Sequence, residues 1–134
     1  MVLQSLEGLP AFIAYFCLAT VLVIAFLLIY TRLTPINEFE LVRKNVPGAT
    51  IALGLSLLGF AMPLASAIAH AADLMDCAIW GVVALIVQII TFYAVRIPVP
   101  DLSNRIAAGE LAPAIWLGLA SLTAGLLSAA SMTL

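Results

Sequence analysis

The stretch Gly59–His70, which reads GFAMPLASAIAH, decides how this chain folds. Pro63 lies deep inside an apolar run, and a proline within a helix has no amide hydrogen to donate to the carbonyl four residues back, here that of Gly59. In a lipid bilayer no water can replace that hydrogen bond, so a side chain or a neighbouring helix must supply a donor. The stretch therefore predicts a helix that needs partners on one of its faces.

That face follows from steps of four and three residues, which mark one side of a helix. Its residues are Ala52, Ser56, Gly59, Pro63, Ser66 and His70. They are small or polar, whereas the opposite side carries mainly Leu, Ile, Phe and Met. Membrane helices turn faces of this kind toward other helices. Two interpretations stay open, a packing stripe between helices and the lining of a polar path.

The composition shows that lipid is the solvent of this chain. Hydrophobic residues make up 65% of its 134 residues and charged residues 9%, against roughly 45–50% and about 25% in soluble domains. Four segments without Asp, Glu, Lys or Arg are each about as long as the ~20 residues that cross a bilayer. These segments are Gly8–Thr31, Asn45–Ala72, Cys77–Val95 and Leu111–Leu134. The sequence predicts an all-α membrane protein with four transmembrane helices in a single transmembrane domain, residues 1–134.

Positive charges predict the orientation. Arg32, Arg43 and Lys44 lie in or beside the first connection between spans, and Arg96 and Arg105 flank the third. Cytoplasmic loops of membrane proteins carry an excess of Lys and Arg. Both termini are therefore expected on the non-cytoplasmic side.

An internal repeat is also indicated. Shifting the sequence by 64 residues, without a gap, aligns Arg32 with Arg96, Gly54 with Gly118 and Ala65 with Ala129. Because one register aligns both halves, we predict two tandem helix hairpins, at about residues 8–72 and 73–134.

Two groups of polar residues could carry chemistry. Gln88, with Thr91 one turn further along, lies in the middle of the third span, where its amide must be hydrogen-bonded inside the bundle, for example to the stripe at Ser56, Gly59 and Pro63. His70 precedes Asp73 and Asp76 at the outer hairpin, where they could relay protons or bind a cation. The structural interpretations are glue between helices for Gln88 and helix capping for the acidic pair.

Several function classes are disfavoured. No charged residue lies in the middle of a span, whereas proton-coupled four-span multidrug exporters, which match this chain in size, depend on a glutamate in their first helix. The chain has no nucleophile–base signature, metal motif or phosphate loop, so we expect no catalytic residues, metal or cofactor. A net charge of −2 argues against nucleic-acid binding.

The longest connection, Leu33–Val46, is a candidate docking site for a cytoplasmic or membrane partner. Its apolar residues alternate with charged ones, so it could form a short amphipathic helix on the membrane surface or an ordinary solvated loop. The charged residues are Glu38, Glu40, Arg43 and Lys44.

The chain resembles the YjfL-like family of small bacterial inner-membrane proteins of unknown function. The resemblance extends over nearly the whole chain and rests on Leu41-Val42-Arg43-Lys44-Asn45, Gly59-Phe60 with Pro63-Leu64-Ala65-Ser66-Ala67-Ile68, Asp76, Trp80-Gly81, Arg105-Ile106, Gly109-Glu110-Leu111-Ala112, Gly125-Leu126-Leu127, Ala129-Ala130 and Met132-Thr133. It implies four spans in two repeats in the bacterial inner (plasma) membrane, and a genomic neighbourhood linked to envelope stress. It implies no enzymatic activity.

Two functional expectations follow. The first is a non-enzymatic, self-associating integral membrane protein in membrane maintenance or envelope stress, with the lipid bilayer, further copies and a protein partner as its contacts. The alternative is an oligomeric small channel or transporter for an ion or small solute.

Overall fold

The computed structural model describes residues 6–33, 38–99 and 101–132, and within them every regular element is a helix, without strands. Four helices are long and apolar enough to cross a membrane, which confirms the predicted four spans. Two short helices precede the second and fourth spans. The helices are α2 (Leu9–Leu33), α3 (Glu38–Arg43), α4 (Pro47–His70), α5 (Leu74–Ala94), α6 (Leu102–Ala107) and α7 (Leu111–Ser131).

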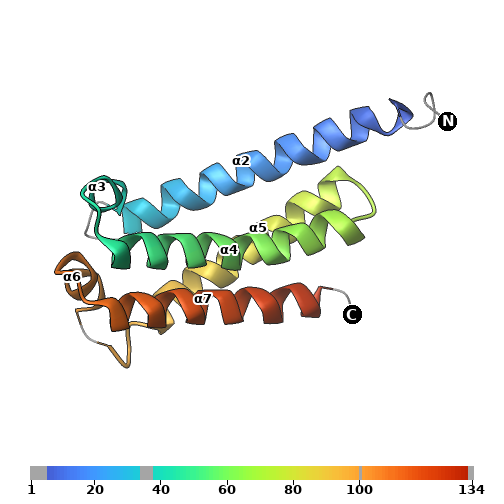
Figure 1. Cartoon of the computed structure of the whole chain (residues 1–134). Helices are drawn as coiled ribbons and strands as arrows, with labels where there is room; N and C mark the ends of the chain where they lie inside the picture. Colours follow the sequence, from blue (N-terminus) through green and yellow to red (C-terminus); the bar gives the residue numbers. More distant parts are fainter. Residues whose placement is uncertain (1–5, 34–37, 100, 133–134) are drawn as a thin grey trace.

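The four long helices give the molecule two distinct ends (Figure 1). The connection end holds α3 and α6. The hairpin end holds residues 71–73, which join α4 to α5, together with the start of α2 and the end of α7. The chain therefore crosses between the same two ends four times.

The centre of the fold is the pair α4 and α7, which run side by side in the same direction (Figure 1). They approach so closely that a Cβ atom added to Gly125 would overlap the carbonyl oxygen of Gly59, and one added to Gly59 would overlap the backbone of Ser121. Gly118 likewise lies against the side chain of Leu55. Small residues let two backbones come this close, which is how helices associate in lipid.

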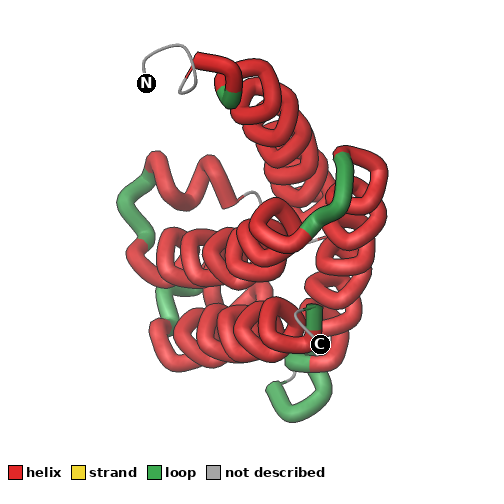
Figure 2. The backbone as a smooth tube through the Cα atoms, turned by 90° about the vertical axis from the view of Figure 1, so that its right-hand side faces the viewer, coloured by secondary structure: helices red, strands yellow, loops and turns green. Residues whose placement is uncertain are grey.

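Helix α2 is held to α4 and α5 by only one of its halves. Its buried residues, Leu22, Phe26 and Tyr30, all lie toward the connection end. The ring of Phe26 stacks on Phe60 of α4 at a centroid distance of 4.9 Å, and Tyr30 meets Phe92 of α5 at 5.3 Å. Figure 2, seen from the hairpin end, shows the other half of α2 diverging from the bundle.

The two short helices end in the same backbone motif. After α3, Asn45 has a φ of 64° and the Val46 N–H donates to the Leu41 carbonyl at 3.0 Å. After α6, Gly109 has a φ of 92° and the Glu110 N–H donates to a carbonyl five residues back at 3.1 Å. Both are Schellman caps, in which a left-handed residue lets the chain turn back over the helix end. Their corresponding residues are 64 positions apart.

Two local features go beyond the expectations. For the first connection the sequence allowed either a short helix or a loop, and in the structure Glu38–Arg43 forms the helix α3. The connection Leu102–Glu110, in which no helix was predicted, contains α6, because Leu102 and Ile106 are one turn apart and both are buried, against the bundle.

Candidate functional site

The deepest polar residues meet at one point between α4, α5 and α7. Gln88 of α5 is 3% exposed, and its Nε2 donates to the carbonyls of Gly59 at 3.1 Å and Ser121 at 3.2 Å. The hydroxyl of Ser56 lies 3.4 Å from that of Ser121. We call these four residues, Ser56, Gly59, Gln88 and Ser121, the polar junction.

The polar junction provides the hydrogen bond that the sequence requires. Pro63 is buried inside α4 and cannot donate to the Gly59 carbonyl. The amide of Gln88 takes the place of the missing N–H, so the acceptor is satisfied without water. Among the described residues, no buried side-chain nitrogen or oxygen of the junction lacks a hydrogen bond. The group contains no titratable side chain, and the chemistry that it displays is hydrogen bonding between helices.

The remaining members of the predicted stripe do not join the junction. Ser66 donates to the Ala129 carbonyl of α7 at 3.1 Å, and the exposed His70 contacts the Ser66 carbonyl through Nδ1 at 2.9 Å. Thr91 donates to the Val87 carbonyl of its own helix. The structure thus joins Gln88 to Ser56 and Gly59 and leaves His70 and Thr91 apart.

The two acidic residues of the hairpin end fix the start of α5. Asp73 accepts a hydrogen bond from the Asp76 N–H at 2.8 Å, and the Asp76 carboxylate accepts one from the Ala72 N–H at 3.0 Å. Asp73 is thus the N-cap of α5, and Asp76 holds the residue that precedes this cap. Within the described residues neither carboxylate forms an ion pair with His70, and no group of His, Cys, Asp and Glu is arranged to hold a metal ion.

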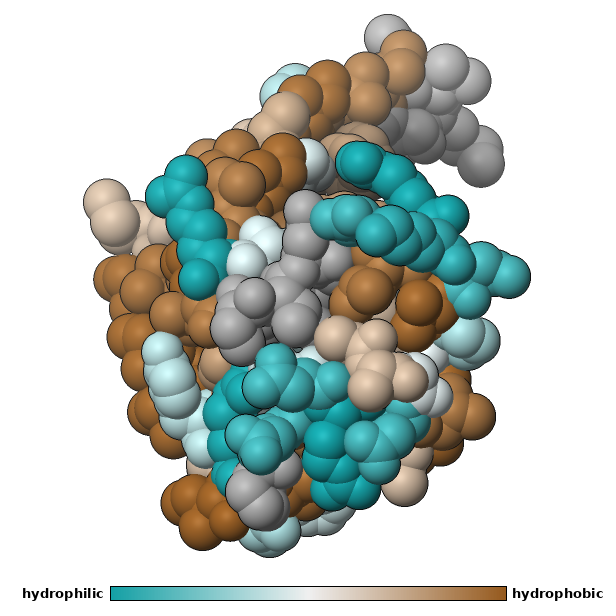
Figure 3. Space-filling model, turned by 90° about the vertical axis from the view of Figure 1, so that its left-hand side faces the viewer, coloured by the Kyte–Doolittle hydropathy of each residue, from teal (hydrophilic) through white to brown (hydrophobic). Residues whose placement is uncertain are grey.

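The connection end carries the charged residues of the predicted docking segment (Figure 3). Glu40 and Lys44 form an exposed ion pair at 2.8 Å, and the hydrogen bond from Lys44 lowers the pKa of Glu40. Arg43 is exposed. Glu38 begins α3, and its side chain lies outside the described part of the structure.

One cation at this end has contacts that the sequence analysis missed. Arg96 donates to the Ser103 hydroxyl of α6 at 2.9 Å, and its guanidinium lies 4.0 Å from the centre of the Phe92 ring. A cation over an aromatic face is attracted by the ring quadrupole. The spacing of four residues between Phe92 and Arg96 was the available signal. The contact ties the end of α5 to α6.

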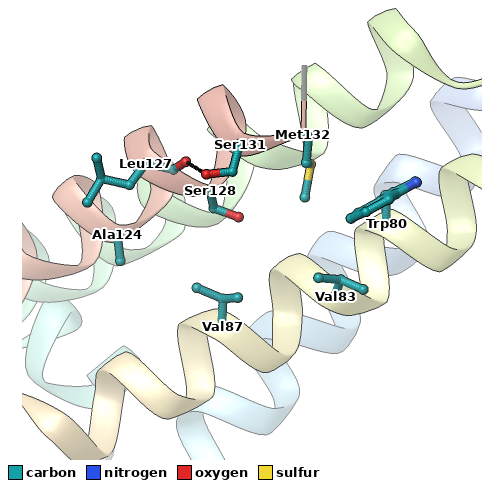
Figure 4. A pocket seen from close by; sticks show the side chains of 8 residues that line it. All are labelled: Trp80, Val83, Val87, Ala124, Leu127, Ser128, Ser131 and Met132. Atoms are coloured by element: carbon teal, nitrogen blue, oxygen red, sulfur yellow. Dashed lines mark hydrogen bonds between the residues drawn. The ribbon is translucent and has the colours of Figure 1, made fainter. Parts of the chain in front are cut away.

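Two grooves open toward the hairpin end, and both were also missed. The larger, of about 410 Å³, lies between α5 and α7, with Trp80 and Met132 at its hairpin end and Val87 and Ala124 at its deep end (Figure 4). The smaller, of about 250 Å³, lies between α2 and α4 and includes Phe16 and Ile68. The grooves were not predictable because each depends on how far two helices diverge.

Together, the four apolar spans and the buried junction between them define a small multi-pass helical membrane protein. Residues 4–132 match the family model described as Domain of Unknown Function (DUF350), and the chain belongs to this family. It is 40% identical over 131 residues to the UPF0719 inner membrane protein YjfL of Escherichia coli (strain K12), an alignment that covers 98% of this chain and 99% of the relative.

The protein of the same name from Escherichia coli O157:H7 matches equally well, at 40% identity over the same length. No solved structure matches the chain. These relatives confirm the resemblance to the YjfL-like family. Together with the four apolar helices they establish a multi-pass protein of the inner membrane.

Proposed function

We propose that this protein is a non-enzymatic, self-associating component of the inner membrane that acts in envelope stress or membrane maintenance, rather than a conductor of solutes. The observation that carries the proposal is the polar junction. The amide nitrogen of Gln88 and the hydroxyls of Ser56 and Ser121 form their hydrogen bonds between three helices of the same chain. A conducting path needs polar groups that remain available to a passing ion or solute.

Flux through liposomes tests this part of the proposal. Ion and small-solute flux through the reconstituted protein should equal that of empty liposomes, and Gln88→Leu and His70→Ala should not change it. Flux above the background that falls in either variant contradicts the proposal and favours the alternative, an oligomeric channel or transporter.

Self-association is supported by a small-residue face on α4 that α7 does not cover. Gly54 has no neighbour within 4 Å of an added Cβ, whereas every other glycine within the described helices meets a neighbour at that distance. Ala61, Ala65 and Ala69 follow Gly54 at helical spacing, and Ala65 and Ala69 are exposed. Small faces let membrane helices pack closely.

The mass of the protein in detergent, measured by light scattering, tests this face. Wild type and the control variant Val21→Leu, at an exposed position of α2, should be oligomeric. Gly54→Leu places a large side chain in the contact and should shift the protein toward the monomer. A monomeric wild type contradicts self-association, and an oligomeric Gly54→Leu protein contradicts this face.

We also propose an origin from two tandem hairpins and an orientation with both termini outside the cytoplasm. Two Schellman caps 64 residues apart support the repeat. The orientation is supported by the chain's five Lys and Arg residues, which all belong to the connection end. Fusions to the C-terminus should show alkaline phosphatase activity and no green fluorescence, and the reverse result contradicts the orientation.

The docking part of the proposal places a protein partner at the connection end, on α3. Phe39 and Val42 of α3 are both exposed, next to the Glu40–Lys44 pair. The envelope-stress role rests on the family resemblance. Affinity purification after Glu40→Ala, Arg43→Ala and Lys44→Ala in combination should lose partners that co-purify with the wild type. Unchanged partners contradict docking through this segment.

A further inference from the structure

The groove between α5 and α7 continues into a polar pocket at the hairpin end. The groove is lined almost entirely by apolar side chains, and Trp80 and Met132 line both spaces. The second space, of about 30 Å³, is lined on its polar side by His70 and Asp76, with Ser66 beside them. The polar pocket has room for about two water-sized groups. An apolar groove with such a pocket at its end fits a lipid whose chain lies in the groove and whose head group lies at the mouth of the pocket.

The groove lies at the depth of one leaflet. It extends from Trp80 to Val87 along α5, which corresponds to about 10 Å at 1.5 Å per residue. Half of a hydrocarbon core is roughly 15 Å thick. The hydroxyl of Ser128 points into the groove (Figure 4) and has no hydrogen-bond partner within the part of the chain that the structure describes. An ester carbonyl of a lipid at this depth is an acceptor for that hydroxyl.

The polar pocket offers one group for each charge of a zwitterionic head group. Asp76 uses one carboxylate oxygen to accept a hydrogen bond from the Ala72 N–H, and its other oxygen makes no hydrogen bond with the described residues. The Ser66 carbonyl can only accept, so Nδ1 of His70 carries the proton of that contact and Nε2 faces no protein partner within the described chain. A carboxylate binds an ammonium group, and His70 in its imidazolium form carries a second proton on Nε2 that it can donate to a phosphate.

Charge favours this lipid over a second copy of the chain. None of the five Lys and Arg side chains belongs to the hairpin end, which carries Asp73 and Asp76. Another copy in the same membrane orientation would bring its own carboxylates to this pocket, and like charges repel. An anionic head group would meet the same repulsion.

We propose that the groove and the polar pocket together form a binding site for one aminophospholipid of the surrounding bilayer. Its acyl chain lies between α5 and α7, its ammonium group meets Asp76 and its phosphate meets His70. The site lies away from Gly54 and does not depend on self-association, so an experiment can contradict the lipid site without contradicting self-association, and the reverse.

Quenching of Trp80 fluorescence by lipids with brominated acyl chains tests the proposal. The protein carries Trp116→Phe, which leaves Trp80 as its single tryptophan, and is reconstituted into phosphatidylcholine vesicles. Brominated phosphatidylethanolamine should reach half-maximal quenching at about one fifth of the mole fraction needed for brominated phosphatidylglycerol, the ratio expected from one half-exposed ion pair. Equal quenching by the two lipids means ordinary contact with the bilayer and overturns the proposal.

Three variants assign the preference to the site. Asp76→Asn removes the charge and keeps an oxygen that can accept from the Ala72 N–H, so the preference for the amine lipid should disappear. Ala124→Phe fills the groove and should weaken quenching by both lipids. The matched control Ala11→Phe fills the groove between α2 and α4, which has no carboxylate in its lining. This variant should leave the quenching by both lipids unchanged.

Retention of the preference in Asp76→Asn overturns the proposal even if Ala124→Phe fails to fold. Wild-type quenching that falls as the protein-to-lipid ratio rises shows a second copy on the groove and overturns it as well.

Discussion

Replacing Gln88 by methionine removes the hydrogen bonds of the polar junction while keeping the volume of the side chain. Two bonds are lost, to the carbonyls of Gly59 and Ser121. At ~0.6 kcal/mol each, the mean for side-chain hydrogen bonds in membranes, the loss is about 1.2 kcal/mol. The Gly59 carbonyl is then left without a donor, because Pro63 has none, and an unsatisfied buried acceptor costs ~1–3 kcal/mol. With the Ser121 bond at ~0.6 kcal/mol, and with ~1–3 kcal/mol for the unsatisfied Gly59 carbonyl in place of its own bond, we expect Gln88→Met to destabilise the fold by about 1.6–3.6 kcal/mol.

A double-mutant cycle with Pro63→Ala isolates the part that depends on the proline. Alanine at position 63 has an amide that can donate to the Gly59 carbonyl within α4. In this background Gln88→Met should cost only the Ser121 bond, ~0.6 kcal/mol. The two substitutions should therefore deviate from additivity by more than the ~0.3–0.5 kcal/mol typical of independent sites.

The assay is reversible unfolding in mixed micelles, followed by the loss of helical circular dichroism as the fraction of sodium dodecyl sulfate rises. If Gln88→Met costs the same free energy with proline and with alanine at position 63, then Gln88 does not replace the missing amide. The account of the polar junction is then wrong.

Three further outcomes are expected. Gly125→Ala should lower the free energy of unfolding of the detergent-solubilised protein by about 1–3 kcal/mol or more, because its Cβ overlaps a carbonyl of α4. Gly54→Ala places its methyl group in open space and should be neutral or slightly stabilising. Asp73→Ala should cost about 1 kcal/mol of unfolding free energy through the lost cap of α5, and Asp73→Asn should restore most of it. Because Lys44 lowers the pKa of Glu40 in the fold, the ion pair stabilises the protein at neutral pH, and this contribution is lost as the pH falls through the folded-state pKa of Glu40. The difference in unfolding free energy between wild type and Lys44→Gln should therefore vanish in acid. A difference that persists in acid contradicts this account of the pair.

The sequence predicted the spans because charge-free length is a direct measure of what a bilayer accepts. It also predicted that Gly59 needs an external donor and that Gln88 needs an acceptor, since both requirements follow from Pro63 and from the absence of water. These are local arguments, and they need no knowledge of which helices are neighbours.

What the sequence did not reveal is the pairing of helices. Several helices carry small-residue stripes, and their spacing does not say which stripe meets which, so Ser121 was not recognised as the second acceptor for Gln88. The burial of α6 was missed for the same reason. The spacing of Leu102 and Ile106 indicates a buried face only when the neighbouring helix is known. The groove at Trp80 depends on the divergence of α5 from α7, which no residue pattern encodes.

The hydrogen bond from Gln88 to Gly59 also has a consequence for biogenesis. The chain is synthesised from its N-terminus, so α2 and α4 enter the membrane before the helix that carries Gln88 exists. Until α5 arrives, the Gly59 carbonyl in the middle of α4 has no protein donor, and the face that will receive α7 is bare. The hydrogen bonding and packing of the first hairpin are therefore incomplete until the second half of the chain has been translated. A chain truncated after α4 presents the membrane with an unsatisfied backbone group, which marks it as incomplete.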